Sequence, residues 1–173
     1  MQYIIETERL GLRELEQEDF GALCLFLQDI EVMYAWEYAF SDEQVREFIS
    51  NQQKRYEVDG FGYYAAVEKE SGKVIGCMGP LMEHIDGEKF YGIGYILGKD
   101  AWGKGYATEA GEASIRYLFE NYAAQKVIAE IRPENEASVR VAERLGMKRE
   151  SQFIKMVKGK QMPHAIYARY AEK

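Results

Sequence analysis

Two glycines, Gly103 and Gly105, lie where a strand-like run gives way to a helix-like run. Residues 91–97 alternate like a strand, and residues 104–122 have the spacing of a helix. Glycine lets backbone N–H groups approach a ligand without interference from a Cβ atom. The first turn of a helix adds unpaired N–H groups and the positive end of its dipole. The spacing predicts an anion cradle, with phosphate as its usual ligand, although the same glycines also suit a plain strand-to-helix turn.

Two nucleotide-binding patterns fit this loop incompletely. The dinucleotide fingerprint G-x-G-x-x-G has Thr108 in place of its third glycine. The Walker pattern G-x-x-x-x-G-K-[ST] is met by Gly98, Gly103 and Lys104. Its final Ser or Thr, which should hold Mg²⁺, is replaced by Gly105. Binding of ATP or GTP is therefore an alternative that lacks its metal ligand.

Composition predicts one globular domain spanning residues 1–173. The chain has 173 residues, 47% of them apolar and 29% charged, which suffices for a full hydrophobic core. A net charge of −7 argues against a nucleic-acid binder, because such proteins carry a basic face. No run approaches the roughly twenty apolar residues of a membrane helix, and the first residues lack the pattern of a signal peptide. We expect a cytoplasmic protein with no nucleic-acid or membrane partner.

Few side chains in the sequence suit a metal. Cys24 and Cys77 lie far apart in apolar contexts, which favours two free thiols in a reducing compartment. The two histidines, His84 and His164, are not clustered with them. We therefore expect no metal site.

The elements that position the loop alternate along the chain. Strand patterns occupy residues 8–15, 61–68, 73–83, 89–97, 126–131, 150–158 and 161–170, and helical spacing occupies 16–28, 41–60, 104–122 and 135–146. Ser41 and Gln44 have the spacing of a capping box at one helix start. The order β–α–α–β–β–β–α–β–α–β–β predicts an α/β domain of the mixed α+β kind with a central sheet.

The segment Trp102–Ala107 (WGKGYA) resembles the pyrophosphate loop of the GNAT superfamily of N-acetyltransferases, whose pattern is [Q/R]-x-x-G-x-[G/A]. Gly105 and Ala107 match that pattern. A tryptophan at the Gln/Arg position, here Trp102, resembles the sequences of the branch that contains ribosomal-protein N-terminal acetyltransferases. A second block, Pro133–Ser138 (PENEAS) followed by ERLGM, resembles the next helix of the family. The two blocks have the family's order and separation, and the resemblance covers nearly the whole chain.

The resemblance implies the GNAT fold, with a mixed, mostly antiparallel seven-stranded sheet, about four helices, and fourth and fifth strands that splay apart. It implies that acetyl-CoA lies in the splay, with its pyrophosphate on the loop and its pantetheine along the fourth strand. Asn135 matches the asparagine that holds the pantetheine, although it also suits a helix cap after Pro133. The cofactor-binding residues implied in this way are Tyr95, Ile96, Leu97, Trp102, Gly103, Lys104, Gly105, Tyr106, Ala107, Thr108, Asn135 and Ser138.

The residues for acyl transfer are less clear, because two positions depart from the family. Transfer from a thioester requires a neutral amine, a donor for the developing oxyanion and a proton for the thiolate. Gly92 occupies a position where many relatives have a glutamate base, and Ala142 replaces the family's tyrosine acid. Glu83, Glu130 and Ser138 are the candidate catalytic substitutes, although each also suits a surface role. Positioning alone, with solvent as the proton acceptor, is the open alternative.

An unusually aromatic connector, residues 32–40, suits either a satellite hydrophobic cluster or the wall of an acceptor pocket. The resemblance favours the wall. The expected acceptor-binding residues are Tyr34, Trp36, Tyr38, Tyr64 and His84. The resulting hypothesis is an acetyl-CoA-dependent N-acetyltransferase that modifies a primary amine, on a protein N-terminus or a small molecule, by direct transfer in a ternary complex. The alternative is a non-catalytic CoA-binding sensor, and the family also raises the possibility of a homodimer.

Overall fold

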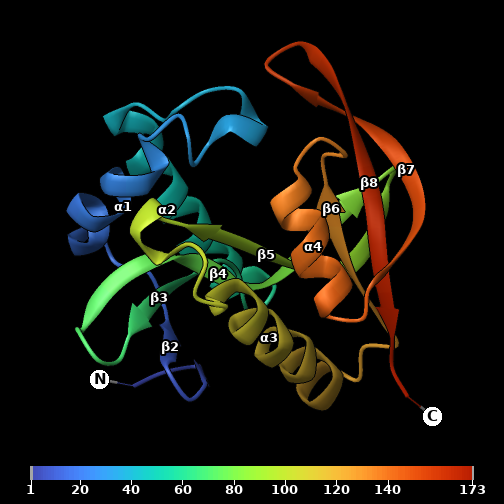
Figure 1. Cartoon of the computed structure of the whole chain (residues 1–173), viewed down its shortest axis with the longest axis horizontal. Helices are drawn as coiled ribbons and strands as arrows, with labels where there is room; N and C mark the ends of the chain where they lie inside the picture. Colours follow the sequence, from blue (N-terminus) through green and yellow to red (C-terminus); the bar gives the residue numbers. More distant parts are fainter. Residues whose placement is uncertain (1, 173) are drawn as a thin grey trace.

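One sheet of eight strands forms the centre of the computed structural model, which describes residues 2–172. The spatial order is β1-β2-β3-β4-β5-β6-β8-β7 (Figure 1). The strands are β1 (Ile5–Glu6), β2 (Leu10–Arg13), β3 (Tyr64–Glu68), β4 (Lys73–Ile85), β5 (Glu88–Leu97), β6 (Lys126–Ile131), β7 (Lys148–Val157) and β8 (Lys160–Tyr170). All seven predicted strands are present. The additional strand, β1, is a two-residue pairing with β2 and is too short to show a periodic pattern.

The four main helices are α1 (Phe20–Leu27), α2 (Asp42–Val58), α3 (Tyr106–Tyr122) and α4 (Glu136–Arg144). Short 3₁₀ turns occupy Gln17–Asp19, Tyr34–Trp36 and Lys99–Ala101. The predicted capping box is confirmed, because Ser41 Oγ accepts from Gln44 N at 3.2 Å and Gln44 Oε1 accepts from Ser41 N at 2.9 Å. The helix predicted from residue 16 begins instead as a 3₁₀ turn, where the Asp19 side chain accepts from Glu16 N.

Helices cover both faces of the sheet (Figure 1). Ala65 and Cys77 belong to a buried cluster with residues of α1 and α2, whereas Ala66 and Met78 belong to a cluster with residues of α3 and α4. Successive residues of a strand point to opposite faces, so each central strand contributes to both layers. Both cysteines are free thiols, as predicted, and burial raises the pKa of Cys77.

The feature that positions the site is the divergence of β5 from β6. These strands are parallel and share a single register pair, Gly92 with Ile128. Beyond Gly92 the remainder of β5 pairs with β4 only, within residues 2–172. Figure 1 shows the two strands separating, with α4 and the β7–β8 hairpin on the β6 side. The predicted splay is therefore present.

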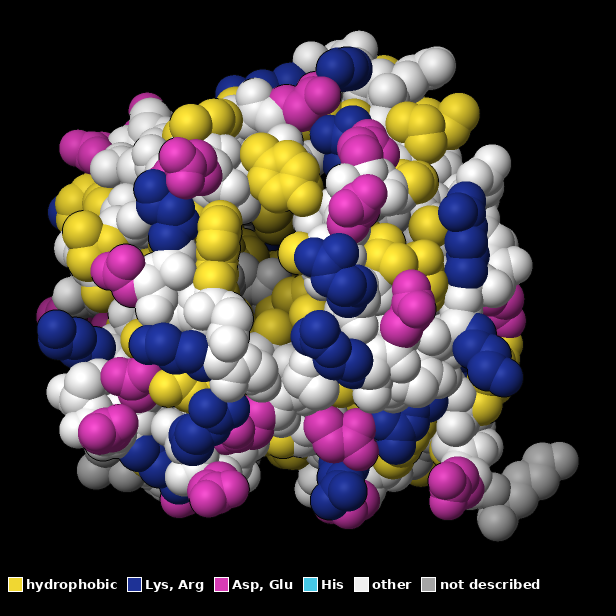
Figure 2. Space-filling model, in the orientation of Figure 1, with side chains coloured by type: hydrophobic (Ala, Val, Ile, Leu, Met, Phe, Trp, Pro, Cys, Tyr) yellow, Lys and Arg dark blue, Asp and Glu magenta, His cyan; other side chains and the backbone are white. Residues whose placement is uncertain are grey.

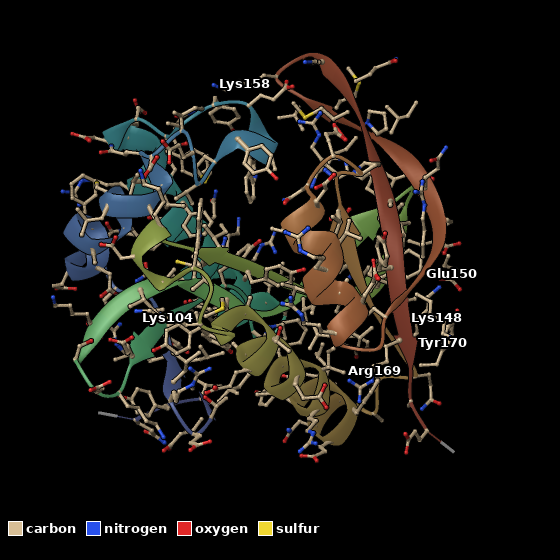
Figure 3. The ribbon with its side chains drawn as sticks, in the orientation of Figure 1. Lys104, Lys148, Glu150, Lys158, Arg169 and Tyr170 are labelled. Atoms are coloured by element: carbon tan, nitrogen blue, oxygen red, sulfur yellow. The ribbon has the colours of Figure 1, made fainter. Side chains whose placement is uncertain are left out.

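The part of the molecule beyond the splay is fastened to α3 through Arg169 of β8. Its Nη1 donates to Glu112 Oε2 of α3 at 2.6 Å and to Leu145 O at the end of α4 at 3.2 Å (Figure 3). On the neighbouring edge Lys126 pairs with Glu150 at 2.6 Å, and the Tyr170 hydroxyl also contacts Glu150.

The described residues show neither a membrane-spanning helix nor a metal cluster. No helix within residues 2–172 is long and apolar enough to cross a membrane. In the same part of the chain, no three His, Cys, Asp or Glu side chains are grouped so that they could hold a metal ion.

Candidate active site

A cleft of ≈ 880 Å³ occupies the splay between β5 and β6. Its walls include the loop before α3, one face of α4, one stripe of α2, the aromatic connector and the β7–β8 hairpin. Figure 2 shows the hollow at the centre of the molecule, with apolar side chains inside it and Lys and Arg side chains along one side. The cleft has two parts, a glycine loop with basic neighbours and an aromatic chamber with charged groups.

The loop before α3 has the geometry of an anion cradle. Gly103 and Gly105 have φ of 75° and 80°, in the left-handed region that favours glycine. A Cβ at Gly103 would meet nothing within 4 Å, and one at Gly105 would meet only Arg9 Nη2, at 3.5 Å. The first intrahelical hydrogen bond of α3 runs from Glu109 N to Gly105 O at 3.0 Å. The N–H groups of the three residues 106–108 therefore precede the helical ladder and are available to an anion.

The negative charge of Glu109, in the first turn of α3, is balanced by a nearby arginine and by hydrogen bonds. Glu109 accepts from the Thr7 hydroxyl at 2.5 Å and from Arg9 N at 2.9 Å, and it pairs with Arg9 Nε at 2.7 Å. Burial alone raises the pKa of Glu109, but these hydrogen bonds outweigh burial and hold the pKa below its usual range. Glu109 therefore remains a carboxylate with compensated charge, and it does not repel an anion at the cradle.

Trp102 fastens the loop to the end of β5. Its indole Nε1 donates to Leu97 O at 2.9 Å, while the residue as a whole is 47% exposed and lines the cleft. The tryptophan at the family's Gln/Arg position thus contributes a hydrogen bond that sets the loop against the strand. Lys104 alone among the predicted loop residues is outside the cleft lining. It lies towards Glu68 on the β3 side of the loop (Figure 3).

The opposite wall of this part comes from the start of α4. Asn135 Oδ1 accepts from Ser138 N at 3.3 Å, so Asn135 caps the helix as well as lining the cleft. It also accepts from the Tyr34 hydroxyl at 2.7 Å, which joins the α4 start to the aromatic connector. The Tyr95 hydroxyl of β5 donates to Ser138 O at 3.0 Å across the splay.

Two basic residues of this wall were missed from the sequence. Arg140 and Arg144 lie one turn apart on α4, and both line the cleft. Guanidinium groups bind phosphate through paired N–H donors. The signal that could have found them is their i, i+4 spacing on the helix that starts at Asn135.

The aromatic chamber contains Tyr34, Trp36 and Tyr38, as expected. The expectation for Tyr64 is wrong, because this residue is 1% exposed and stacks on Tyr56 in the core, with ring centroids 5.1 Å apart. Its neighbour Tyr63 lines the cleft instead. Consecutive side chains of an extended chain point to opposite faces of the sheet, so only one of the two tyrosines can face the cleft. The sequence does not show which of the two does so.

Alternation also corrects the expectation for His84. Glu83 lines the cleft, so the adjacent His84 faces away and is exposed. The histidine that lines the chamber is His164 of β8, whose Nδ1 lies 3.0 Å from Met162 O. Burial lowers the pKa of His164, which favours the neutral ring.

Glu83 occupies the space that a side chain at Gly92 would require. A Cβ built on Gly92 would lie 2.8 Å from Glu83 Cγ, because Gly92 pairs with Leu81 and Glu83 follows two residues later on the same face. Within residues 2–172, Glu83 forms no ion pair. The carboxylate of Glu83 therefore lies in the cleft beside position 92 of β5.

The other catalytic candidates have different surroundings. The Glu130 side chain is 9% exposed and lies 3.7 Å from Lys155 Nζ. Ser138 lines the cleft near the Tyr95 hydroxyl. Ala142 is fully buried, so its position offers no acid to the cleft. Burial raises the pKa of Tyr63 and of Tyr95, so both phenols stay protonated at neutral pH.

Comparison with known proteins agrees with this geometry. Residues 9–148 match the family described as "Acetyltransferase (GNAT) domain". An uncharacterised N-acetyltransferase of Bacillus licheniformis, p20, is 35% identical over 147 residues, which cover 83% of this chain and 82% of that protein.

Solved structures show the same fold. A GNAT-family acetyltransferase from Bacillus anthracis superposes with a TM-score of 0.81 and 28% identity, covering 96% of this chain and 97% of that one. RimL, a ribosomal α-N-protein acetyltransferase in complex with coenzyme A, has a TM-score of 0.78 at 19% identity, covering 98% of each chain. This chain therefore belongs to the GNAT family of N-acetyltransferases.

Proposed function

We propose that the protein transfers the acetyl group of acetyl-CoA to a primary amine, with both substrates bound in one ternary complex. The observation that carries this proposal is the single cleft that joins a glycine cradle, an unpaired strand edge and a charged aromatic chamber. GNAT enzymes use acetyl-CoA, and the RimL structure contains coenzyme A. The two parts of the cleft match the two substrates in chemical character.

The residues present suit acetyl-CoA. The free N–H groups at the start of α3 and the guanidinium groups of Arg140 and Arg144 would hold its phosphates. The unpaired edge of β5 from Ile93 to Leu97 would accept the amide groups of the pantetheine, as a sheet edge accepts an added strand. Asn135 would contact the same arm from α4. Bound acetyl-CoA would supply a thioester whose carbonyl carbon is open to attack.

The base for the amine is most simply Glu83. An alkyl amine has a pKa near 10, so it must lose a proton before its nitrogen forms the new C–N bond. Tyr63 and Tyr95 are held protonated and therefore do not serve as bases. Glu130 lies beside the ammonium of Lys155, whereas Glu83 forms no ion pair among the described residues. Glu83 thus has a free carboxylate in the chamber.

The proton for the departing thiolate is proposed to come from Tyr63. A Cβ at Gly94 would collide with the Tyr63 hydroxyl, so this phenol lies directly against β5. A glycine at that position allows the close approach. When the C–S bond breaks, a protonated phenol at the strand can give its proton to sulfur. Tyr63 would then perform the role that Ala142 has lost.

The experiment that tests this function has two stages. Acetyl-CoA, CoA and ATP with Mg²⁺ are titrated into the protein by calorimetry, and thiol release is then followed with a panel of amines. We expect acetyl-CoA to bind in the micromolar range, ATP not to bind, and thiol release to depend on an amine. Binding of ATP, or of none of the three, would refute the assignment. Acetyl-CoA binding without thiol release for any amine would instead identify a CoA-binding sensor.

A further inference from the structure

One stripe of α2 forms part of the acceptor chamber. Phe48, Gln52 and Arg55 follow the i, i+4, i+7 spacing of a single helix face, and all three line the cleft. Gln52 is already engaged, because its Oε1 accepts from Tyr63 N at 3.0 Å. Phe48 packs beside Tyr63, with ring centroids 5.6 Å apart. Arg55 is the member of the stripe that has a charge to offer.

Arg55 lacks the partner that a buried arginine normally has. Its Nη1 is buried and donates to no acceptor in residues 2–172. No carboxylate in that part of the chain forms an ion pair with it. A guanidinium stays charged at any pH that the fold tolerates, so a shielded and unpaired one is costly. An anion from outside the chain would remove that cost.

A second arginine with a buried nitrogen does not compete for this role. Arg132 Nε also lacks an acceptor. The rest of its guanidinium is occupied, since Nη1 donates to Ala35 O at 3.0 Å and Nη2 pairs with Glu134 at 2.6 Å. Arg132 therefore holds the aromatic connector in place, whereas no such structural contact is made by the Arg55 Nη1 group within residues 2–172.

Opposite charges in the chamber complete the argument. Glu83 and Glu130 line the same cleft as Arg55. The Tyr63 hydroxyl interacts electrostatically both with the positive charge of Arg55 and with the negative charge of Glu130. The chamber therefore offers a cation and carboxylates to one small acceptor, which matches a molecule that carries both an anion and an amine.

We propose that Arg55 is an acceptor-binding residue, and that the acceptor is a primary amine that also bears a carboxylate. This inference rests on the proposed function. A free amino acid meets the requirement, and so does a peptide whose N-terminal segment has an acidic side chain. A polyamine does not, because it would place a second cation beside Arg55.

The test compares acceptors that differ only in the carboxylate. Initial rates are measured with leucine and leucinamide, with phenylalanine and phenylalaninamide, and with C-terminally amidated Ser-Glu-Ala and Ser-Gln-Ala peptides. Each acid and its amide are assayed on the wild type and on Arg55→Gln. The acid-to-amide ratio of rates is compared between the wild type and Arg55→Gln. The difference in amine basicity between acid and amide is the same for both proteins and therefore cancels.

We expect Arg55→Gln to lower kcat/KM for the carboxylate acceptors by about 30-fold, the value of a charge-assisted hydrogen bond, and to leave the neutral acceptors within about twofold. Arg55→Lys should recover part of the loss, because it restores the charge without the planar fork. Lys54→Gln is the matched control, since it removes an exposed positive charge next to Arg55 on α2. It should change neither rate.

A binding measurement separates this inference from the proposed function. The same acids and amides are titrated calorimetrically into the CoA-loaded wild type and Arg55 variants, with thermal unfolding as the check on folding. If acids bind more tightly than amides to the wild type, and Arg55→Gln loses this preference, the carboxylate subsite is supported even when no acetyl group is transferred. The lack of transfer would then refute only the proposed transferase activity. Amide acceptors used as well as acids by the wild type would overturn the subsite and leave the transferase intact. A preference confined to the Glu peptide would identify a protein N-terminus as the carboxylate source.

Discussion

At the scale of single residues, the cleft places the carboxylate of Glu83, on β4, beside Gly92 of the neighbouring strand β5. Gly92 leaves a space on β5, and Glu83 of β4 fills it, with its Cγ 2.8 Å from the Cβ that Gly92 lacks. The two positions lie on one face because Leu81 is the direct partner of Gly92. A glycine at position 92 of β5 is therefore compatible with the proposed general-base catalysis.

Glu83→Gln should lower kcat by about 10²- to 10⁴-fold, the usual contribution of a general base. The affinity for acetyl-CoA should stay unchanged, because the phosphate cradle lies elsewhere. Initial rates and calorimetry check both expectations, and Glu88→Gln, at the exposed first residue of β5, is the control. The double variant Glu83→Ala/Gly92→Glu should recover about tenfold over Glu83→Ala alone, because it restores a carboxylate in the same space. No recovery would mean that Glu83 acts through structure.

Gly105→Ala should weaken acetyl-CoA binding more than it destabilises the fold. Its φ of 80° makes any side chain there cost about 1 kcal/mol. The Cβ would be added to a residue that lines the cleft and directly precedes the free N–H groups of residues 106–108. Gly72 has a similar φ of 75° in the β3–β4 turn, away from the cleft, and a Cβ there meets nothing within 4 Å. Gly72→Ala should therefore show the same loss of stability with normal affinity. Equal affinity for both variants would remove Gly105 from the cradle.

At the scale of elements, a buried ion pair sets the junction between β2 and α1. Arg13 donates two hydrogen bonds to Asp19, at 2.9 and 2.8 Å, and Glu16 N donates a third at 2.9 Å. Burial alone raises the pKa of Asp19, but these hydrogen bonds outweigh it and hold the pKa below its usual value. This clamp ends the strand and starts the 3₁₀ turn that leads into α1.

Asp19→Asn should lower the free energy of unfolding by about 2–3 kcal/mol at pH 7, because it leaves Arg13 without its anionic partner. A carboxyl with a lowered folded-state pKa stabilises the protein above its unfolded-state pKa of about 3.9, and the effect is lost as the pH falls through the folded value. The difference between variant and wild type should shrink accordingly near pH 3. Urea unfolding at both pH values checks this, with the exposed Glu57→Gln as control. A pH-independent difference would contradict the linkage.

At the scale of the whole molecule, two portions of the sheet meet at a narrow junction. β5 and β6 share one register pair. Residues of the β7–β8 hairpin, on the β6 side, contact the aromatic connector across the cleft. Lys158, at the tip of the β7–β8 hairpin, lies 3.6 Å from the centre of the Tyr38 ring, and Lys160 pairs with Glu37 at 2.7 Å (Figure 3). The aromatic connector and the hairpin thus close the aromatic chamber together.

Acetyl-CoA should stabilise this junction. Ligand at 100 times its dissociation constant adds about 2.7 kcal/mol to the folded state, which raises Tm. Because the ligand would bridge β5 and α4, amide exchange should slow at residues 93–97 and 106–108. The amides of β2 and β3 pair within the sheet and should not change. Exchange mass spectrometry with and without acetyl-CoA checks this, and uniform protection across the sheet would argue against a bridging site.

Much of the fold follows from local patterns. The capping box at Ser41, the strand Lys126–Ile131 and the glycine loop before α3 depend on residues close together in sequence, and all are present as predicted. The β1 strand and the 3₁₀ start before α1 were not predicted, because the first is two residues long and the second depends on Arg13 and Asp19. Local propensity carries no information about either.

The sequence by itself determined the family, the glycine loop before α3 and the order of the main elements, because each depends on motifs or on periodic patterns of residues close together in the chain. Only the tertiary structure decided which side chains meet in the cleft. It selected Tyr63 over Tyr64 and Glu83 over His84, since strand alternation has two phases and packing chooses between them. It also brought Arg55 of α2 to the lining of the cleft, a placement that spacing along the chain does not predict.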